Sequence, residues 1–303
     1  MKKILTIHFS QSGQLTEIVN RYCEGIENVE FDHVKVSPKI PFPFPWTNDV
    51  FFDIMPDTVL ETPFDLEPYN LKYEKYDLII LAYQPWFLSP SLPVTALLKD
   101  EKFKSLVQDT PIITLIGSRN MWLNAQESIK KLILEANGKL VGNVPLIDKN
   151  PNLLSVISIL HWMQTGKKTK KWGIFPKPGV SDEDILGIKR FGTELNDSFA
   201  KNDFSNYQAK VAEQGGVIIP TNILFIEGKA KRIFLIWANI IQRKTASGGN
   251  RKFWVNFFKY YLLFALFIVS PILLLVYFVF IYPFTTTKVK IKKAYYRGVG
   301  YNS

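Results

Sequence analysis

The sequence predicts an α/β protein with a five-stranded, doubly wound parallel sheet, a helical C-terminal extension, and a transmembrane or re-entrant helix. Three observations support this prediction. Five strand-like runs alternate with helical ones, the third run is apolar without interruption, and the chain ends in a long uncharged segment followed by a basic tail. A chain of 303 residues has room for one full α/β domain and a smaller second element.

The expected sheet follows from the spacing of apolar residues. Runs rich in Ile, Leu and Val cover residues 4–9, 29–36, 76–82, 111–117 and 139–147. Helical spacing is found in residues 14–25, 91–99 and 121–137. Strands joined by helices need crossover connections, so the sheet is parallel. A parallel sheet is covered on both faces, and this explains the unbroken run Leu78-Ile79-Ile80-Leu81.

Residues 38–68 replace the expected crossover between the second and third strands. This stretch holds seven prolines among aromatic residues, and so many prolines exclude a long helix. Its Phe and Trp content predicts a loop folded against the domain. A lid and a purely structural wrap both remain open.

The pattern changes after residue 150. Residues 152–165 predict an apolar helix that ends at Gly166, Ser181 is the expected N-cap of a second helix, and residues 223–242 predict a third. We therefore divide the chain into an N-terminal α/β domain (1–150), a helical extension (151–250), and a membrane anchor with a basic tail (251–303).

The membrane segment is predicted from residues 260–284, which hold no charged side chain over twenty-five positions. A helix needs about 20 apolar residues to cross the hydrocarbon core of a bilayer. Tyrosines at both ends suit the headgroup level. Basic residues lie on both sides of the segment, so the charge distribution does not set its topology. Pro271 at the midpoint allows either a kinked span or a shallow re-entrant hairpin.

The charge distribution argues against nucleic acid as a partner. The net charge is +10, but thirteen basic and no acidic residues follow Gly228, which leaves residues 1–228 at about −3. Basic residues next to an apolar segment suit anionic lipid. The single cysteine, Cys23, lies at an apolar helical position and is expected to be a small buried side chain. One cysteine cannot form a disulfide within the chain, and the first residues show no signal-peptide cleavage pattern. Both observations suit a membrane-anchored protein with a cytoplasmic catalytic domain.

The first strand-to-helix turn predicts a phosphate site. Backbone N–H groups at a helix N-terminus bind phosphate, and hydroxyl side chains add donors. Gly13 allows close approach of the ligand. An ordinary helix cap is the simpler alternative. The candidate residues are Ser10, Gln11, Ser12, Gly13, Gln14 and Leu15.

Two further loops follow the third and fourth expected strands, at the edge where doubly wound sheets bind ligands. Each brings an aromatic side chain to that edge, where a flat ring could rest. Arg119 could stabilise a reduced, anionic flavin. Trp86 could instead only pack the sheet edge, and Arg119 could pair with a carboxylate. Together the three loops predict an FMN site and no metal site, with these further residues: Pro85, Trp86, Phe87, Leu88, Gly117, Ser118, Arg119 and Asn120.

Residues 1–148 resemble the flavodoxin-like, quinone-reductase-type FMN proteins. The loop Ser10-Gln11-Ser12-Gly13-Gln14 is similar to their phosphate loop. Gln84-Pro85-Trp86-Phe87, Leu92-Pro93 and Leu97-Leu98-Lys99-Asp100 are similar to the loop and helix beside their isoalloxazine. Leu15 departs from the hydroxyl residue often found there, which puts one phosphate contact in doubt.

Four segments resemble a narrower family, the "dialkylresorcinol condensing enzymes" of dialkylresorcinol and flexirubin-type pigment biosynthesis. They are residues 43–47, 83–90, 117–126 and 173–179. The resemblance implies that a ketosynthase-like partner performs the carbon–carbon condensation and that this chain aromatises a dialkylcyclohexanedione. The sequence shows no Cys nucleophile with His partners for a thioester condensation, which agrees with that division.

The sequence thus predicts a membrane-attached FMN oxidoreductase that acts on a lipophilic small molecule. The alternatives are a flavodoxin-like electron carrier or quinone reductase, and a flavin-less membrane scaffold for the partner. His8, Tyr83 and His161 are the candidate bases, but the sequence assigns the role to none of them.

Overall fold

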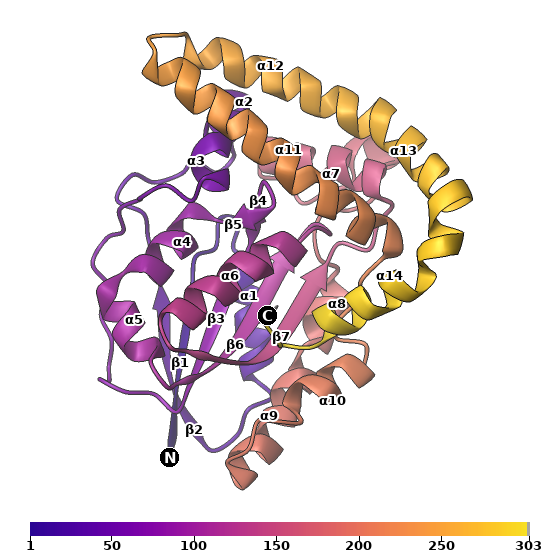
Figure 1. The fold of residues 1–303 in the computed structure, drawn as a ribbon. Coiled ribbons are helices and arrows are strands. Elements are labelled where there is room, and N and C mark those ends of the chain that lie inside the picture. Colours follow the sequence, from indigo (N-terminus) through magenta and orange to yellow (C-terminus); the bar gives the residue numbers. More distant parts are fainter. Residues whose placement is uncertain (302–303) are drawn as a thin grey trace.

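The computed structural model describes residues 1–301 and contains a five-stranded sheet in the order β2-β1-β3-β6-β7 (Figure 1). All four strand pairs are parallel. The strands are β1 (Lys2–His8), β2 (Val29–Lys35), β3 (Leu78–Tyr83), β6 (Pro111–Ser118) and β7 (Lys139–Ile147). This is the doubly wound, flavodoxin-like order, with its switch point between β1 and β3. The predicted fold class and the five predicted strands are confirmed.

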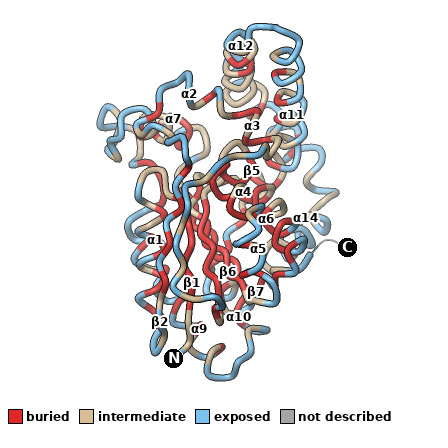
Figure 2. Tube along the Cα trace, turned by 90° about the vertical axis from the view of Figure 1, so that its left-hand side faces the viewer, coloured by how far each residue is buried: buried red, intermediate tan, exposed pale blue. Residues whose placement is uncertain are grey.

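Helices cover both faces of the sheet (Figure 1). One face carries α4 (Leu92–Lys99), α5 (Glu101–Val107) and α6 (Leu123–Glu135). The other carries α1 (Gln14–Cys23), which packs against α8 (Asp182–Gly187) and α9 (Lys189–Lys201). Burial on both faces explains the composition of the strands, since all six residues of β3 are buried. Figure 2 shows the same contrast, with buried strands inside exposed helix surfaces.

The helical extension begins with α7 (Asn152–Thr165), a short 3₁₀ turn (Lys171–Gly173) and α8. Ser181 caps α8 by accepting a hydrogen bond from the backbone N–H of Asp184, as predicted. Two helices were not predicted, α9 and α10 (Tyr207–Glu213); α10 packs against β7. The last helix of the extension is α11 (Thr221–Ala246). Side chains of α8 to α10 share one hydrophobic core with the sheet.

The proline-rich insertion forms two short helices, α2 (Asn48–Asp53) and α3 (Met55–Val59). Phe52, Met55 and Val59 are buried in a second hydrophobic cluster that includes side chains of α11. The prediction of a folded segment without a long helix is therefore confirmed.

Cys23 is buried on α1, and burial raises the pKa of its thiol to about 12. The predicted role as a small buried side chain fits this environment.

The chain then forms one continuous helix over Arg251–Arg297, which is long and apolar enough to cross a membrane by length and composition. It bends around the domain as an arc (Figure 1). Its parts are α12 (Arg251–Phe264), a π-helical turn (Ala265–Val269), α13 (Ser270–Val276), a second π-helical turn (Tyr277–Ile281) and α14 (Tyr282–Arg297). Only 6% of its most apolar window is buried. We call this helix the apolar arc.

Candidate functional site

The turn between β1 and α1 has the geometry of an anion site. Gly13 is the N-cap of α1 at φ 87°, and no side chain caps the helix there. A Cβ on Gly13 would meet no atom within 4 Å, so the left-handed conformation, not a lack of space in the protein, favours glycine. The Ser10 hydroxyl is buried and has no hydrogen-bond partner among the described residues. The first turn of α1 thus leaves backbone donors and a hydroxyl for a ligand.

The two glutamines of this turn hold the neighbouring walls of the site. Gln11 donates to the carbonyl of Pro43 at 2.9 Å, which fixes the insertion. Gln14 donates to the carbonyl of Val180 at 3.1 Å and accepts from its N–H at 3.2 Å. Their side chains therefore hold the insertion and the segment at Val180 against this turn.

The loop after β3 is a small antiparallel hairpin of β4 (Pro85–Trp86) and β5 (Ser89–Pro90). Its two central residues, Phe87 and Leu88, have φ of 46° and 64°. Two consecutive left-handed residues without glycine or asparagine are strained, and such strain tends to collect at functional sites. Trp86 is half-buried and meets Phe9, Phe42 and Trp46 edge to face.

The loop after β6 places Arg119 at the same edge. Its guanidinium donates to the side-chain and backbone oxygens of Asn152, at 2.7 and 3.1 Å. Burial lowers the pKa of Arg119 to about 10, partly offset by Asp148 and Glu227, so the group keeps its charge at neutral pH. Asn120 donates to the same Asn152 oxygen at 2.8 Å. Arg119 therefore pairs with an amide and not with a carboxylate.

These three loops meet in a cavity of about 230 Å³ at the carboxyl edge of the sheet. The far side is closed by the proline-rich insertion and by α7, neither of which was among the predicted site residues. Phe44, Trp46 and Phe51 come from the insertion, and Ile159, Trp162 and Met163 from α7. The backbone N–H of Trp46 donates to the carbonyl of Met163 at 2.7 Å and joins the two regions.

The predicted residues divide into two groups. Ten line the cavity: Gln11, Ser12, Gln14, Leu15, Pro85, Trp86, Phe87, Gly117, Ser118 and Arg119. Four lie beside it without lining it: Ser10, Gly13, Leu88 and Asn120. Sequence reasoning missed Ile18, Gln84 and Gly179 in the lining, besides the six residues of the far side. Gln84 could have been predicted from the sequence, because it directly precedes Pro85 in the loop after the third strand.

Unpaired polar atoms are concentrated at this edge. Gln84, Ser118 and Trp46 line the cavity, and each has a buried side-chain atom (Nε2, Oγ and Nε1, respectively) with no hydrogen-bond partner among the described residues. Ser10 Oγ and Asn120 Oδ1, in the same loops, are also unpaired. Each such group costs about 1–3 kcal/mol if it stays unsatisfied, so a polar ligand is the natural partner.

None of the three candidate bases lines the cavity. His8 is buried, and its Nε2 is hydrogen-bonded to Thr16 Oγ1 at 2.9 Å. Burial is the main cause that lowers the pKa of His8 to about 4. The hydroxyl of Tyr83 is buried and donates to Gln126 at 2.7 Å, and burial raises its pKa well above 10. Arg119 is the one charged side chain among the described lining residues, and no metal-ligand cluster occurs within residues 1–301.

No protein-family model matches the chain, and no curated protein matches it. Among solved structures, it is similar to an FMN complex of a flavoprotein from Lactobacillus acidophilus NCFM, with 18% identity over 48% of this chain and 93% of that one, and a TM-score of 0.39. A putative flavoprotein from Bacteroides eggerthii DSM 20697 gives 15% identity, 48% and 89% coverage, and a TM-score of 0.39. A flavodoxin from the domain Archaea is 15% identical over 65% of this chain and 97% of that one, with a TM-score of 0.36. The flavodoxin-like assignment itself rests on the strand order and parallel pairing of this chain.

Proposed function

We propose that the chain is an FMN-dependent oxidoreductase. The observation that carries the proposal is the group of unpaired buried polar atoms around an aromatic cavity, next to the open N-terminus of α1. The first turn of α1, with Ser10 and Ser12, suits the phosphate. Trp86 and Phe87 offer apolar surface to a flat ring, and Gln84 and Ser118 offer hydrogen bonds to its polar edge.

Arg119 has a defined role in this proposal. Its side chain is held by Asn152, so its position is fixed before any ligand binds. A fixed positive charge at the ring stabilises negative charge that develops there on reduction. When bound, FMN supplies a two-electron acceptor, which is what conversion of a cyclic diketone to an aromatic diol requires.

The proposed substrate is a dialkylcyclohexanedione, which is oxidised to a dialkylresorcinol. A mainly apolar lining supports a lipophilic substrate. Phe51 and Phe87 line the cavity and also pack against the cluster that contains Phe258 of α12. The cavity wall is thus continuous with the base of the apolar arc, which supports attachment to a membrane that holds substrate and product.

The lining holds no carboxylate or histidine, so in this proposal the ring proton leaves to water at the cavity mouth. In this proposal a ketosynthase-like partner on the cytoplasmic side makes the diketone. The insertion and α7 cover the cavity, which disfavours a simple electron carrier, since a carrier exchanges electrons through an exposed flavin edge.

The test begins with the full chain in detergent, incubated with a short-chain dialkylcyclohexanedione without oxygen. We expect stoichiometric FMN, bleaching of the flavin absorbance, and formation of the resorcinol in equal amount. The matching saturated cyclohexanediol, which cannot be aromatised by one two-electron step, is the control. A flavin-containing protein that stays oxidised with the diketone contradicts the substrate; a protein without flavin contradicts the cofactor.

A further inference from the structure

The start of the apolar arc is fixed to the insertion. Arg251 donates to Asp53 Oδ1 and to Asp57 Oδ2, each at 2.7 Å, and Lys252 donates to Asp49 at 2.7 Å. Val255 and Phe258 are buried among side chains of α2, α3 and α11. The first two turns of the arc are therefore part of the folded domain.

The far end of the arc returns to the same domain. Tyr295 Oη donates to the carboxylate of Glu127 at 3.0 Å, and the buried ammonium of Lys130 donates to Tyr295 Oη at 3.1 Å. Lys130 also donates to the carbonyl of Gly300 at 2.8 Å, and Gln208 to the carbonyl of Arg297 at 2.7 Å. Both ends of the apolar stretch are thus bound to the same folded part of the chain.

The middle of the arc bends to make this return possible. Two π-helical turns, Ala265–Val269 and Tyr277–Ile281, interrupt the α-helical hydrogen bonding, and Pro271 and Pro283 each remove a backbone donor. Both features cause bends in helices. Tyr277 stacks on Phe225 of α11 with ring centroids 3.9 Å apart, which holds the bend against the domain.

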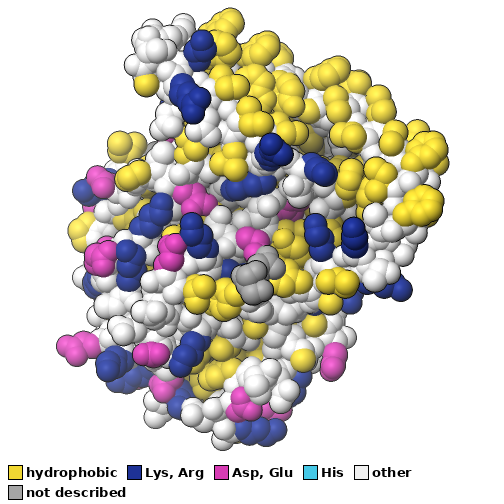
Figure 3. All heavy atoms as spheres, viewed as in Figure 1, with side chains coloured by type: hydrophobic (Ala, Val, Ile, Leu, Met, Phe, Trp, Pro, Cys, Tyr) yellow, Lys and Arg dark blue, Asp and Glu magenta, His cyan; other side chains and the backbone are white. Residues whose placement is uncertain are grey.

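The outer side of the arc is apolar. Five of its large apolar side chains are 53–67% exposed, and Figure 3 shows a band of hydrophobic side chains along this rim. They are Phe257, Phe264, Ile272, Leu275 and Phe280. A soluble surface rarely exposes a continuous apolar band of this length.

Basic side chains border the band, and no acidic residue follows Glu227 in the sequence. The exposed ones are Lys229, Arg232, Arg243, Lys244, Lys252, Lys288, Lys290, Lys292 and Arg297. An apolar face with a cationic border is complementary to a bilayer with anionic headgroups, whereas a second copy of this chain would bring like charges together.

We propose that the apolar arc lies in the plane of an anionic bilayer, inserted into one leaflet, with both of its ends on the cytoplasmic side. This inference rests on the proposed membrane attachment and makes it specific. A helix that spans the bilayer would place residues 288–301 on the opposite side. That arrangement would break the contacts of Tyr295, Lys130 and Gln208 and leave the buried Lys130 charge without its tyrosine and carbonyl partners.

Cysteine labelling distinguishes the two arrangements. Ser247→Cys and Ala294→Cys are small changes at exposed positions before and after the uncharged residues 260–284, and the native Cys23 is buried. Right-side-out and inside-out membrane vesicles from expressing cells are treated with a membrane-impermeant maleimide. We expect both variants to label in inside-out vesicles alone. Labelling of the two variants in opposite preparations would show a transmembrane span and overturn the proposal.

Flotation of the purified full chain with vesicles tests the occupant of the apolar band. Phe280→Glu should abolish flotation, whereas Ile40→Glu, at a 77% exposed apolar residue of the insertion, should not change it. Lys290→Gln and Lys292→Gln should each weaken binding to phosphatidylglycerol vesicles roughly fivefold, with little effect on phosphatidylcholine vesicles. A protein that fails to float and forms a dimer dispersed by Phe280→Glu would overturn the proposal in favour of self-association. None of these readouts depends on flavin, so failure of the FMN proposal is seen separately.

Discussion

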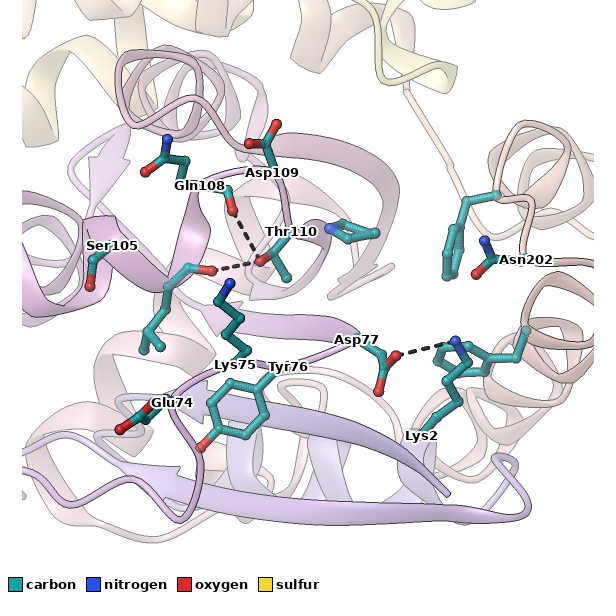
Figure 4. A pocket seen from close by; sticks show the side chains of 14 residues that line it. Lys2, Glu74, Lys75, Tyr76, Asp77, Ser105, Gln108, Asp109, Thr110 and Asn202 are labelled. Atoms are coloured by element: carbon teal, nitrogen blue, oxygen red, sulfur yellow. Dashed lines mark hydrogen bonds and ion pairs between the residues drawn. The ribbon is translucent and has the colours of Figure 1, made fainter.

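The two edges of the sheet each carry a hollow, and the two hollows differ in the state of their polar groups. The one at the amino edge is larger, about 540 Å³ against about 230 Å³ at the carboxyl edge. Figure 4 shows the larger one, with Lys2 and Asp77 paired at 3.2 Å and Thr110 hydrogen-bonded within its own turn. No described side chain that lines it has a buried polar atom without a partner.

In the smaller hollow, by contrast, buried polar atoms lack partners. Its described lining residues include one charged side chain, Arg119, and three residues with a buried polar atom that has no partner. Volume alone would therefore select the amino edge, not the carboxyl edge at which we propose the flavin site. Unsatisfied polar groups select the edge at which doubly wound sheets bind ligands, because a fold tolerates such groups where a ligand satisfies them.

The largest expected effect comes from a charge placed in the phosphate loop. Ser12→Glu should weaken FMN binding roughly a thousandfold, since like charges about 4 Å apart repel by about 4 kcal/mol near a protein surface. Ser12→Ala is the isosteric control and should cost about tenfold or less. Fluorescence titration of apoprotein with FMN measures both. Equal affinities for Ser12→Glu and the parent would move the site elsewhere.

A strained residue at Gly13 tests the same loop without adding charge. Gly13→Val should cost about 1–3 kcal/mol at φ 87° and reduce FMN affinity with it. Gly215→Val is the matched control, because Gly215 also has a positive φ of 75° with open space around it and lies after α10. If both variants lose equal stability and neither loses flavin, the conformation of Gly13 is only structural.

The carboxylates near the two edges should respond to pH in opposite directions. Burial raises the pKa of Glu227 to about 8, although hydrogen bonds from Asn124 oppose the shift. The stability that this group contributes is present in full below its unfolded pKa near 4.5 and is lost as the pH rises through 8. Glu227→Gln should remove this loss, a change of up to a few kcal/mol, and melting curves from pH 4.5 to 9 measure it. A parent protein with flat stability across that window would contradict the assignment.

Asp77 at the amino edge is the opposite case. Burial opposes ionisation, but hydrogen bonds from the Lys3 N–H and Lys2 outweigh it and lower the pKa of Asp77. Its stabilising contribution is therefore present above its unfolded pKa of 3.8 and fades as the pH falls through the lower folded value. Melting curves of Asp77→Asn should depart from those of the parent above that range and converge with them in stronger acid.

Removal of the Trp86 side chain should have an intermediate effect on FMN affinity. Trp86→Ala should weaken FMN roughly two- to tenfold, in line with the 0.5–1.5 kcal/mol typical of aromatic pairs. It should also lower the melting temperature, because Trp86 packs against Phe9, Phe42 and Trp46. Trp172→Ala, at a 75% exposed tryptophan, is the control. A loss of stability with unchanged flavin affinity and potential would limit Trp86 to packing.

The smallest effect is expected from the larger hollow. Asp77→Asn breaks the ion pair with Lys2, whose side chain is 41% exposed, and such pairs contribute at most about 1 kcal/mol. FMN affinity should stay within experimental error of the parent. A clear loss of flavin in Asp77→Asn would mean that the comparison of the two edges is misleading.

The sheet and the three loops were predictable because their signals are local. The runs of β1 and β3 and the turn around Gly13 depend on a few consecutive residues. The hairpin at Phe87 and Leu88 could not be predicted, since its two left-handed residues are neither glycine nor asparagine. Short helices such as α10, with seven residues, contain too few apolar positions for helical spacing to be recognised in the sequence.

The far wall of the cavity and the path of the apolar arc needed tertiary information. Trp46 meets Met163 across more than a hundred residues, and Lys130 meets Tyr295 across 165. An uncharged stretch predicts contact with lipid, but only the contacts at its two ends indicate how it lies. Sequence reasoning therefore left the choice between a span and a re-entrant segment open.

The most direct test of the central claim is the flavin content of the purified full chain, measured by visible absorbance together with FMN titration of the stripped protein. The account predicts one FMN per chain, released intact on denaturation, rebound by the parent protein and by Asp77→Asn, and not rebound by Ser12→Glu. A colourless protein that does not bind FMN, or equal rebinding by Ser12→Glu and the parent, would contradict a flavin site at the carboxyl edge of the sheet.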